Sequence, residues 1–313
     1  MRDPFPWSVF AGLAREAEAL GYAAVFLPEI AGRDALVALG SLAGETERLL
    51  LGTGIITMKA RTTMLTAMGA ATVHERSSGR MLLGLGTGPA GAGALDGLRA
   101  LVVSVRRLLA GERVEIDGWT SQLSLALRDP VPIWISALGP RAVRLAGEVA
   151  DGVLLNWCSP ERVAAARSQL REGAEAAGRD PASVTIGVYV RASLGADQPA
   201  ALRALQVAAG EYASFPAYAR QFAAIGLQDE AQAAAVAHAA GRPGEVPMAL
   251  VNAICLFGDP VAARLRLEAF REAGADLPIV YPVAAGDHPE GSVSETLRAL
   301  APGVHSRPKG FQG

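Results

Sequence analysis

Seven short apolar runs, separated by amphipathic stretches, dominate the pattern of hydrophobic and polar residues in this chain. The runs are Ala23–Leu27, Leu49–Ile56, Met81–Gly86, Val131–Ser136, Gly152–Asn156, Val184–Val190 and Ile279–Val283. Strand-like runs that alternate with helix-like stretches predict an α/β fold with a parallel sheet of βαβ units. Eight such units close a barrel, whose chemistry lies at the carboxyl ends of its strands. The pattern therefore predicts a barrel-like sheet whose first strand is absent or truncated in this sequence.

The missing strand would precede the first predicted helix. We expect Ser8 to cap the start of this helix and Gly21 to follow its end. The few residues before Ser8 include Pro4 and Pro6. Proline lacks the N–H group that a central strand donates, so this segment does not supply a buried strand. Two explanations stay open. Either the barrel is open at this position or Met1 lies downstream of the true start, and we favour the second.

Two stretches interrupt the alternation. Residues 112–127 place Asp117-Gly118 between Val114–Ile116 and Leu123–Leu127, which predicts an inserted hairpin. Residues 197–247 are rich in alanine and predict two or three helices with a mobile loop at 241–244. An insertion after a late barrel strand lies on the active-site side, so we expect this one to act as a lid. The rest of the pattern predicts one domain over residues 1–302 and a loose tail over 303–313.

Composition and charge exclude several classes of function. Of the 313 residues 50% are hydrophobic, and the formal net charge is −2. A charge this close to zero gives no electrostatic basis for binding nucleic acid or an anionic membrane. No apolar run reaches the roughly 20 residues that span a bilayer, and no secretory signal pattern is present. Cys158, Cys255 and the four histidines lack the spacing of metal ligands, so we expect no metal site. The default expectation for the location is the cytoplasm.

Three turns, one inside the second run and two at the ends of later runs, are candidate cofactor-binding segments. They comprise Thr53, Gly54 and Ile55, then Gly86, Thr87 and Gly88, and finally Ser136, Ala137, Leu138 and Gly139. Residues 86–91 match the pattern G-x-G-x-x-G, which lets backbone N–H groups approach a phosphate or a planar ring. The helix expected after Gly139 would offer free N–H groups to an anion. On the residues alone the alternative is structural: tight strand–helix turns, or barrel curvature at residues 52–55.

Glu29 is the candidate catalytic residue. It follows the first run, at the carboxyl end of a strand, where barrel enzymes place acids, bases and polar anchors. A salt bridge to the nearby Arg33 is the structural alternative. No arrangement of serine or cysteine with histidine is legible in the sequence. We therefore expect a cofactor to carry the chemistry.

Several motifs occur in a specific order and spacing between about residues 9 and 290. They are Ala17–Tyr22 with Val25–Glu29, Thr46–Arg48, Leu51–Ile55, Ser78–Arg80 with Leu83–Gly88, Val131–Ile135, and Leu145–Glu148 with Ala150–Gly152. Together they resemble the luciferase-like monooxygenase superfamily and, within it, the oxidoreductases that depend on the deazaflavin coenzyme F420. The resemblance implies a TIM (β/α)8-type barrel, usually dimeric, that binds F420 or FMN at the carboxyl ends of its strands.

The resemblance also implies roles for the three turns. It places a bulge with a non-proline cis peptide at Gly54-Ile55, against the ring of the cofactor. It places a loop of the cofactor site at residues 86–88, and a turn that meets the side chain or phosphate of the cofactor at residues 136–139. We expect Asn156, Trp157, Tyr212 and Phe215 on the substrate side, with core packing as the alternative for these aromatic residues.

The resemblance makes an F420-dependent oxidoreductase the leading prediction. Hydride would pass between C5 of the deazaflavin and a small organic substrate, with Glu29 as proton donor or acceptor. An FMN-dependent monooxygenase that uses reduced flavin and oxygen is the alternative. A third hypothesis is a cofactor-binding homologue without catalysis, since Ile30 stands where many relatives carry a histidine. A Rossmann dehydrogenase fits poorly, because the runs are spread evenly to residue 283.

Overall fold

The computed structural model describes residues 5–89, 91–116 and 118–302. They form two compact units. The first contains the chain up to Ala137 with Arg141–Leu154 and Gln169–Val184, and the second contains Leu138–Pro140, Leu155–Ser168 and the chain from Thr185 onward. The predicted tail at 303–313, the segment before residue 5 and the turn residue Asp117 lie outside the described residues. A single domain over residues 1–302 stays a prediction.

The first unit is built on a parallel sheet. Its strands are β1 (Ala24–Leu27), β2 (Leu50–Thr53), β3 (Ile56–Thr57), β4 (Met81–Gly86), β7 (Ile133–Ser136) and the first three residues of β8 (Gly152–Asn156), whose last two residues belong to the second unit. Strand β2 lies between β1 and β4, β7 lies between β4 and β8, and β3 pairs with β4. Parallel strands are covered on both faces and so form continuous apolar runs, as the six buried residues of β4 illustrate. For this reason the strands coincide with the predicted runs, except that the run at 49–56 is divided into β2 and β3.

Helices connect these strands. They are α1 (Trp7–Ala19), α2 (Ala35–Leu42), α3 (Thr63–Arg76), α4 (Ala94–Leu109) and α5 (Pro140–Val149), followed by α6 (Pro160–Ala176) and the short 3-10 helix η1 (Pro181–Ser183). The side chain of Asp34 caps α2 by accepting the N–H of Val37 at 3.0 Å, and Thr62 caps α3 in the same way. In the described residues before β1 the chain forms α1 and no strand.

The expected cap of the first helix is wrong. Helix α1 begins at Trp7, directly after Pro6, so Ser8 lies inside the helix and makes no capping hydrogen bond. Pro6 lacks an N–H group, and its extended backbone leads directly into the helix. The expected end is confirmed, since Gly21 has a φ of 87° in the left-handed region that glycine tolerates.

Charged residues hold the amino ends of the strands together. Glu18 accepts the backbone N–H groups of Glu47, Arg48 and Leu49. Arg80 donates to the carbonyl groups of Ala43, Thr46 and Leu49. Asp151 accepts the N–H of Ile133 at 2.8 Å and pairs with Arg106 at 2.9 Å. Several motifs of the family resemblance therefore stabilise the end of the sheet opposite to the one that carries chemistry in barrels.

The second unit centres on β9 (Thr185–Ala192), which pairs in parallel with β10 (Cys255–Leu256) and β11 (Leu277–Pro282). Asp276 accepts the N–H of Ile186 at 2.7 Å and pairs with Arg167, which repeats the arrangement of Asp151 in the first unit. Helices α11 (Pro260–Glu272) and α12 (Pro289–Ala299) flank β11 in the sequence.

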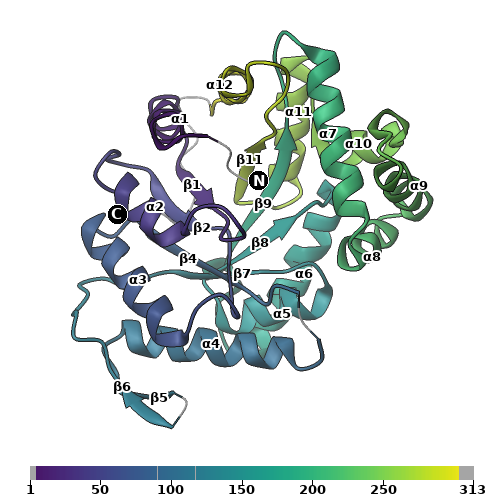
Figure 1. Cartoon of the computed structure of the whole chain (residues 1–313). Coiled ribbons are helices and arrows are strands. Elements are labelled where there is room, and N and C mark those ends of the chain that lie inside the picture. The colour runs from purple at the N-terminus through teal and green to yellow at the C-terminus, as the bar shows by residue number, and fades with distance from the viewer. Residues whose placement is uncertain (1–4, 90, 117, 303–313) are drawn as a thin grey trace. The chain divides into compact units, whose positions relative to one another are not determined.

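The predicted helical insertion is present in the second unit. It contains α7 (Gln198–Ala213), α8 (Pro216–Ala224), α9 (Gln228–Ala239) and the 3-10 helix η2 (Pro243–Glu245), and α10 (Met248–Ile254) follows (Figure 1). These helices share a buried cluster that includes Leu205, Phe222 and Leu250. The sequence pattern missed α10 and the two-residue strand β10, because both are shorter than the stretch of residues over which a period can be recognised. The lid role of the insertion stays a prediction.

The inserted hairpin is also present, but its second strand differs from the expected one. Strand β5 (Val114–Ile116) pairs with β6 (Trp119–Ser121) in antiparallel register, and the hairpin projects away from the sheet (Figure 1). The segment 123–127, expected to be the partner, forms no strand. A two-residue connection brings the residues immediately after it into register, so Trp119 pairs with Ile116.

None of the described helices is long and apolar enough to cross a membrane.

Candidate active site

One residue from each of the three predicted turns meets the other two at the carboxyl ends of the strands in the first unit. A Cβ atom on Gly86 would lie 2.4 Å from Oγ of Ser136 and 2.5 Å from Cδ1 of Ile55. Thr57 lies opposite Gly86 in the β3–β4 register. Only glycine at position 86 therefore lets the side chains of Ile55 and Ser136 approach each other across β4.

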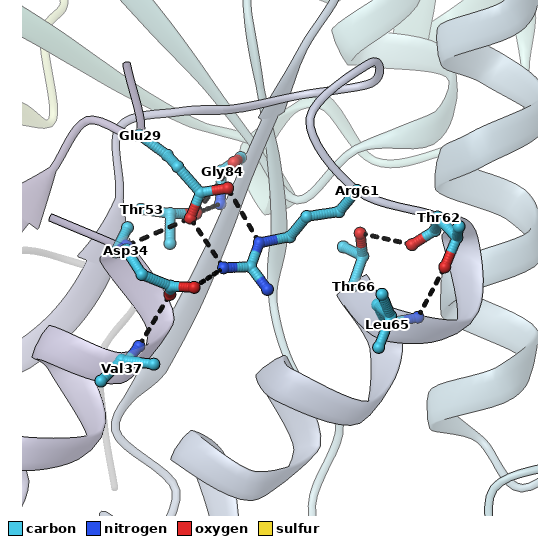
Figure 2. A network of polar contacts seen from close by, with 10 residues as sticks. Glu29, Asp34, Val37, Thr53, Arg61, Thr62, Leu65, Thr66 and Gly84 are labelled. Carbon is cyan, nitrogen blue, oxygen red and sulfur yellow. Dashed lines mark hydrogen bonds and ion pairs between the residues drawn. The ribbon is translucent and has the colours of Figure 1, made fainter. Parts of the chain in front are cut away.

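Hydrogen bonds hold the segment between β2 and β3 in place. The hydroxyl of Thr53 accepts the N–H of Gly84 and donates to its carbonyl, both at 2.8 Å (Figure 2). The N–H of Gly54 donates to the carbonyl of Leu27 at 2.7 Å, and the N–H of Glu29 donates to the carbonyl of Ile55 at 3.1 Å. The expected cis peptide is present between Gly54 and Ile55. Because its hydroxyl is fully used inside the protein, Thr53 positions this segment.

The turn after β7 offers backbone donors. Helix α5 begins at Pro140, and the N–H groups of Leu138, Gly139 and Arg141 donate to no acceptor in the described part of the chain. Gly139 is exposed, and a Cβ atom there would meet no other atom within 4 Å. A helix start with free N–H groups and an open glycine suits an approaching phosphate. This donor set fits the phosphate of a cofactor.

The loop after β4 adds little side-chain chemistry. The hydroxyl of Thr87 donates to the carbonyl of Gly88 at 3.0 Å. Gly88 has a φ of 62°, and a Cβ atom there would lie 3.0 Å from the side chain of Thr57. The loop therefore presents mainly backbone to any molecule at this end of β4.

Glu29 is bound on both oxygens. Arg61 donates from Nε to Oε1 at 2.8 Å and from Nη2 to Oε2 at 3.1 Å, while the N–H of Ala35 donates to Oε2 at 3.1 Å (Figure 2). Arg61 also pairs with Asp34. The hydrogen bonds to Glu29 raise the pKa of Arg61 above its usual range. Figure 2 shows the arginine reaching across from the loop before α3 to the segment after β1.

The structural alternative for Glu29, a salt bridge to Arg33, is wrong in its partner, because Arg61 takes that place. The guanidinium of Arg33 donates instead to the carbonyl of Phe5 and lies 5.2 Å from the ring centre of Phe10. Arg61 was missed because it lies 32 residues further along the chain, where no local pattern links it to Glu29.

The second unit gathers most of the predicted substrate-side residues. Nδ2 of Asn156 donates to the hydroxyl of Tyr218 at 2.8 Å. The rings of Trp157 and Tyr212 lie 4.8 Å apart, and those of Tyr212 and Tyr218 also lie 4.8 Å apart. Phe215 is 46% exposed and contacts this group from its edge, with its ring 5.7 Å from that of Tyr212. Asn156, Trp157 and Tyr212 therefore form one cluster, which Tyr218 joins.

Two further side chains complete this cluster. Nε2 of Gln221, on α8, donates to the carbonyl groups of Asn156 at 2.6 Å and of Trp157 at 2.5 Å. Arg191, on β9, donates to Oδ1 of Asn156. Neither residue was predicted. Arg191 lies one residue beyond the apolar run that predicted β9, and Gln221 lies in a helix without a distinctive motif.

The two cysteines do not provide a nucleophile. Both thiols are buried, and burial raises the pKa of Cys158 and of Cys255 to about 12. They are therefore protonated at neutral pH and unreactive. The described residues also contain no group of three His, Cys, Asp or Glu side chains that could hold a metal ion.

Comparison with known proteins agrees with this geometry. The family model for luciferase-like monooxygenases matches residues 2–277. The 5,10-methylenetetrahydromethanopterin reductase of Methanolobus tindarius is 34% identical over 212 residues, which are 63% of this chain and 65% of the relative. The F420-dependent glucose-6-phosphate dehydrogenase of Beutenbergia cavernae is 34% identical over 193 residues, 54% of this chain and 56% of the relative. The chain thus spans less than two thirds of the length of each of these curated relatives.

Solved structures share the fold over almost the whole chain. The coenzyme F420-dependent tetrahydromethanopterin reductase of Methanopyrus kandleri has a TM-score of 0.77 at 21% identity, covering 95% of each chain. The FMN-bound oxygenating constituent of 3,6-diketocamphane monooxygenase from Pseudomonas putida has a TM-score of 0.68 at 16% identity, covering 96% of this chain and 94% of the other. The predicted α/β fold of the luciferase-like barrel type is therefore confirmed.

Proposed function

The chain belongs to the luciferase-like monooxygenase family, and on that premise we propose that it is an F420-dependent oxidoreductase. When bound, F420 would supply hydride transfer at its deazaflavin ring to or from a small organic substrate. The proposal is supported by relatives named as F420-dependent and by the chemistry of the turns described above.

The observation that carries the proposal is the meeting of Ile55, Gly86 and Ser136 at the carboxyl ends of their strands. Gly54, Ile55 and residues 86–88 present backbone and one aliphatic side chain, which suit a planar ring. The unpaired N–H groups of Leu138 and Gly139 suit a phosphate. Ser136 and Ala137 connect these two regions along the chain. We assign the cofactor to these residues.

We propose that Glu29 acts as a positioning residue rather than as the proton carrier predicted from the sequence. Both of its oxygens already accept hydrogen bonds from Arg61 and Ala35. The pair of Glu29 and Arg61 joins the segment after β1 to the loop before α3. The backbone N–H of Glu29 also donates to the carbonyl of Ile55. A disturbed Glu29 would therefore displace a residue that we assign to the cofactor.

On the substrate side we propose Asn156, Trp157 and Tyr212, with Phe215 at the edge. Trp157 is 1% exposed and has a φ of 52°, an uncommon conformation for a bulky residue. Such conformations persist where the surroundings enforce them, and they cluster at functional sites. Gln221 supplies part of that enforcement, because it donates to the carbonyl groups of the two peptides that flank the Cα atom of Trp157.

Titration of the purified protein with F420 and with FMN tests the cofactor. We expect saturable F420 binding, measured by quenching of its fluorescence, and hydride transfer to a substrate at the expense of the reduced cofactor. Tight FMN binding together with no F420 binding would overturn the proposal. A cofactor-binding homologue without catalysis would bind F420 and turn over none of a broad panel of substrates.

An FMN-dependent monooxygenase is the second candidate, favoured by the fold shared with the FMN-bound monooxygenase of Pseudomonas putida. This enzyme would consume oxygen when supplied with reduced FMN. Free reduced FMN also reacts with oxygen by itself, so an F420 oxidoreductase would leave the rate of oxygen uptake equal to that of a control without protein and would form no oxygenated product. An oxygen electrode therefore separates the two.

We also propose a homodimer in the cytoplasm. The dimer is what the family resemblance implies, and light scattering of the purified protein at several concentrations measures it. Two buried, unpaired cysteines are consistent with a reducing compartment. Fractionation of the producing cells tests the location.

A further inference from the structure

Arg191 is a buried cation near the carboxyl end of β9. It is the second-last residue of that strand, and it is 4% exposed. Its neighbours across the sheet are Cys255 on β10 and Tyr281 on β11. Barrel strands carry their chemistry at this end. A buried charge at this position is costly unless a partner compensates it.

Aromatic rings surround this guanidinium. Its central carbon lies 4.2 Å from the ring centre of Tyr281, 4.4 Å from that of Trp157, 5.4 Å from that of Tyr212 and 5.9 Å from that of Tyr189. The faces of aromatic rings stabilise a cation by about 0.5–2 kcal/mol each.

No carboxylate faces Arg191 in the described part of the chain. Its charge interacts with Tyr212, Tyr218, Cys255 and Tyr189, none of which is a carboxylate. Burial lowers the pKa of Arg191, but a guanidinium stays protonated at neutral pH. Arg167 in the same unit differs, because it is paired with Asp276. The positive charge of Arg191 is thus uncompensated.

The surroundings of Arg191 contain more hydrogen-bond donors than acceptors. Arg191 donates from Nη1 to Asn156, and its Nε and Nη2 atoms have no acceptor among the described residues. These two atoms are not among the sealed side-chain atoms without a partner, so some accessible space remains beside them. Nε1 of Trp157, the ring stacked on Arg191, and the hydroxyl of Ser193, two residues along the chain, are sealed and have no partner. What is missing is an acceptor with negative charge.

We propose that Arg191 binds a carboxylate or phosphate monoester group of the substrate. The planar guanidinium presents two parallel N–H groups that match either anion. The phosphate of the cofactor already has donors at Leu138 and Gly139, whereas Arg191 lies among residues that we assign to the substrate. The substrate is then an organic anion, an assignment that rests on the proposed function, although anion binding at Arg191 can be measured without it.

Calorimetric titration of the protein without cofactor tests the site, with phenyl phosphate and benzoate as probes and benzyl alcohol as the neutral control. We expect the anions to bind and the alcohol not to bind. Arg191→Met weakens anion binding by about tenfold or more, since charged hydrogen bonds are lost. Asn156→Asp weakens anion binding by a similar factor, because the new carboxylate pairs with the guanidinium and competes with the added anion. Arg167→Met leaves anion binding unchanged.

Thermal unfolding separates a binding role from a structural one. Methionine is apolar and suits the aromatic surroundings, so Arg191→Met is expected to unfold at the same temperature as the wild type or higher. Asn156→Asp is also expected to unfold at a higher temperature, because it compensates a buried charge. Arg167→Met is expected to unfold at a lower temperature, because Asp276 loses its partner. An Arg191→Met protein that is less stable and binds the anions normally overturns the proposal.

Competition with F420 identifies the source of the anion. We expect F420 and phenyl phosphate to bind together, without displacing each other. Displacement of the probe by F420 would assign Arg191 to the phosphate of the cofactor and overturn the proposed substrate class. A protein that binds the anions but not F420 would overturn the proposed function and leave this site intact.

Discussion

Arg61 binds Glu29 with two nitrogen atoms, at 2.8 Å to Oε1 and 3.1 Å to Oε2. The two side chains are 18% and 13% exposed, so their contact is largely shielded from water. This relationship favours a positioning role for Glu29, because three of the roughly four lone-pair positions of its carboxylate already accept hydrogen bonds that tie two segments together.

We predict that Glu29→Gln and Arg61→Met have similar effects. Each breaks the two-point contact and should lower the free energy of unfolding by about 1–3 kcal/mol, measured by urea denaturation. Each should also weaken F420 binding, and the double variant should be no worse than the single ones, because the two residues act as one unit. The pH profile of kcat/KM should keep its shape. Loss of one limb of that profile in Glu29→Gln alone would show instead that Glu29 carries the proton.

Gly139→Ala should separate cofactor binding from folding. Gly139 has open space around it and does not adopt a positive φ, so alanine should change the free energy of unfolding by less than about 0.5 kcal/mol. The added methyl group should hinder a phosphate from reaching the backbone N–H, and F420 affinity should fall about tenfold. Equilibrium dialysis measures the affinity.

Gly52→Ala is the matched control for that experiment. A Cβ atom on Gly52 would lie 2.3 Å from the ring of Phe26, so this variant should be destabilised by about 1–3 kcal/mol. If Gly139→Ala binds F420 as tightly as the wild type, the turn after β7 does not hold the phosphate.

The two thiols should resist alkylation in the folded protein. Both are buried, and burial raises the pKa of each to about 12, so little thiolate forms at about pH 8. Mass spectrometry after treatment with iodoacetamide should show no modification of the native chain and two modifications of the unfolded chain. Rapid labelling of either cysteine in the native protein would contradict the buried placement.

Acid should destabilise the protein partly through His74. This residue is 4% exposed in α3, and burial lowers its pKa below the usual value of 6.5. As the pH falls through 6.5, the unfolded chain takes up a proton that the native chain excludes, so the free energy of unfolding falls with pH. His74→Leu should reduce this loss between about pH 7.5 and about pH 5.5 in urea denaturation. Substitution of the exposed His288 by leucine is the control and should leave the slope unchanged.

Much of the fold was predictable, because strands buried on both faces must be apolar throughout. β4 and β7 therefore lie inside the runs predicted for them. The strand β10 was not predictable, since two residues carry no period, and it is defined only by its pairing with Arg191 and Ala192 of β9.

The candidate site was predictable only where the backbone itself carries the role. Glycine-rich turns at the carboxyl ends of strands can be located along the sequence, because the absence of a side chain is visible in the residue type. The partners of Glu29 and Asn156 were not predictable. Arg61 lies 32 residues from Glu29, and Arg191 lies 35 residues from Asn156.

The sequence by itself determined the order of strands and helices, the positions of the glycine turns and the family, since these depend on local pattern and spacing. Only the tertiary structure decided that Glu29 is bound by Arg61 and that Arg191 lies among aromatic rings without a carboxylate. The physical reason is that a charged side chain acquires its role from the groups that surround it. Those groups come from distant segments that meet only when the chain folds.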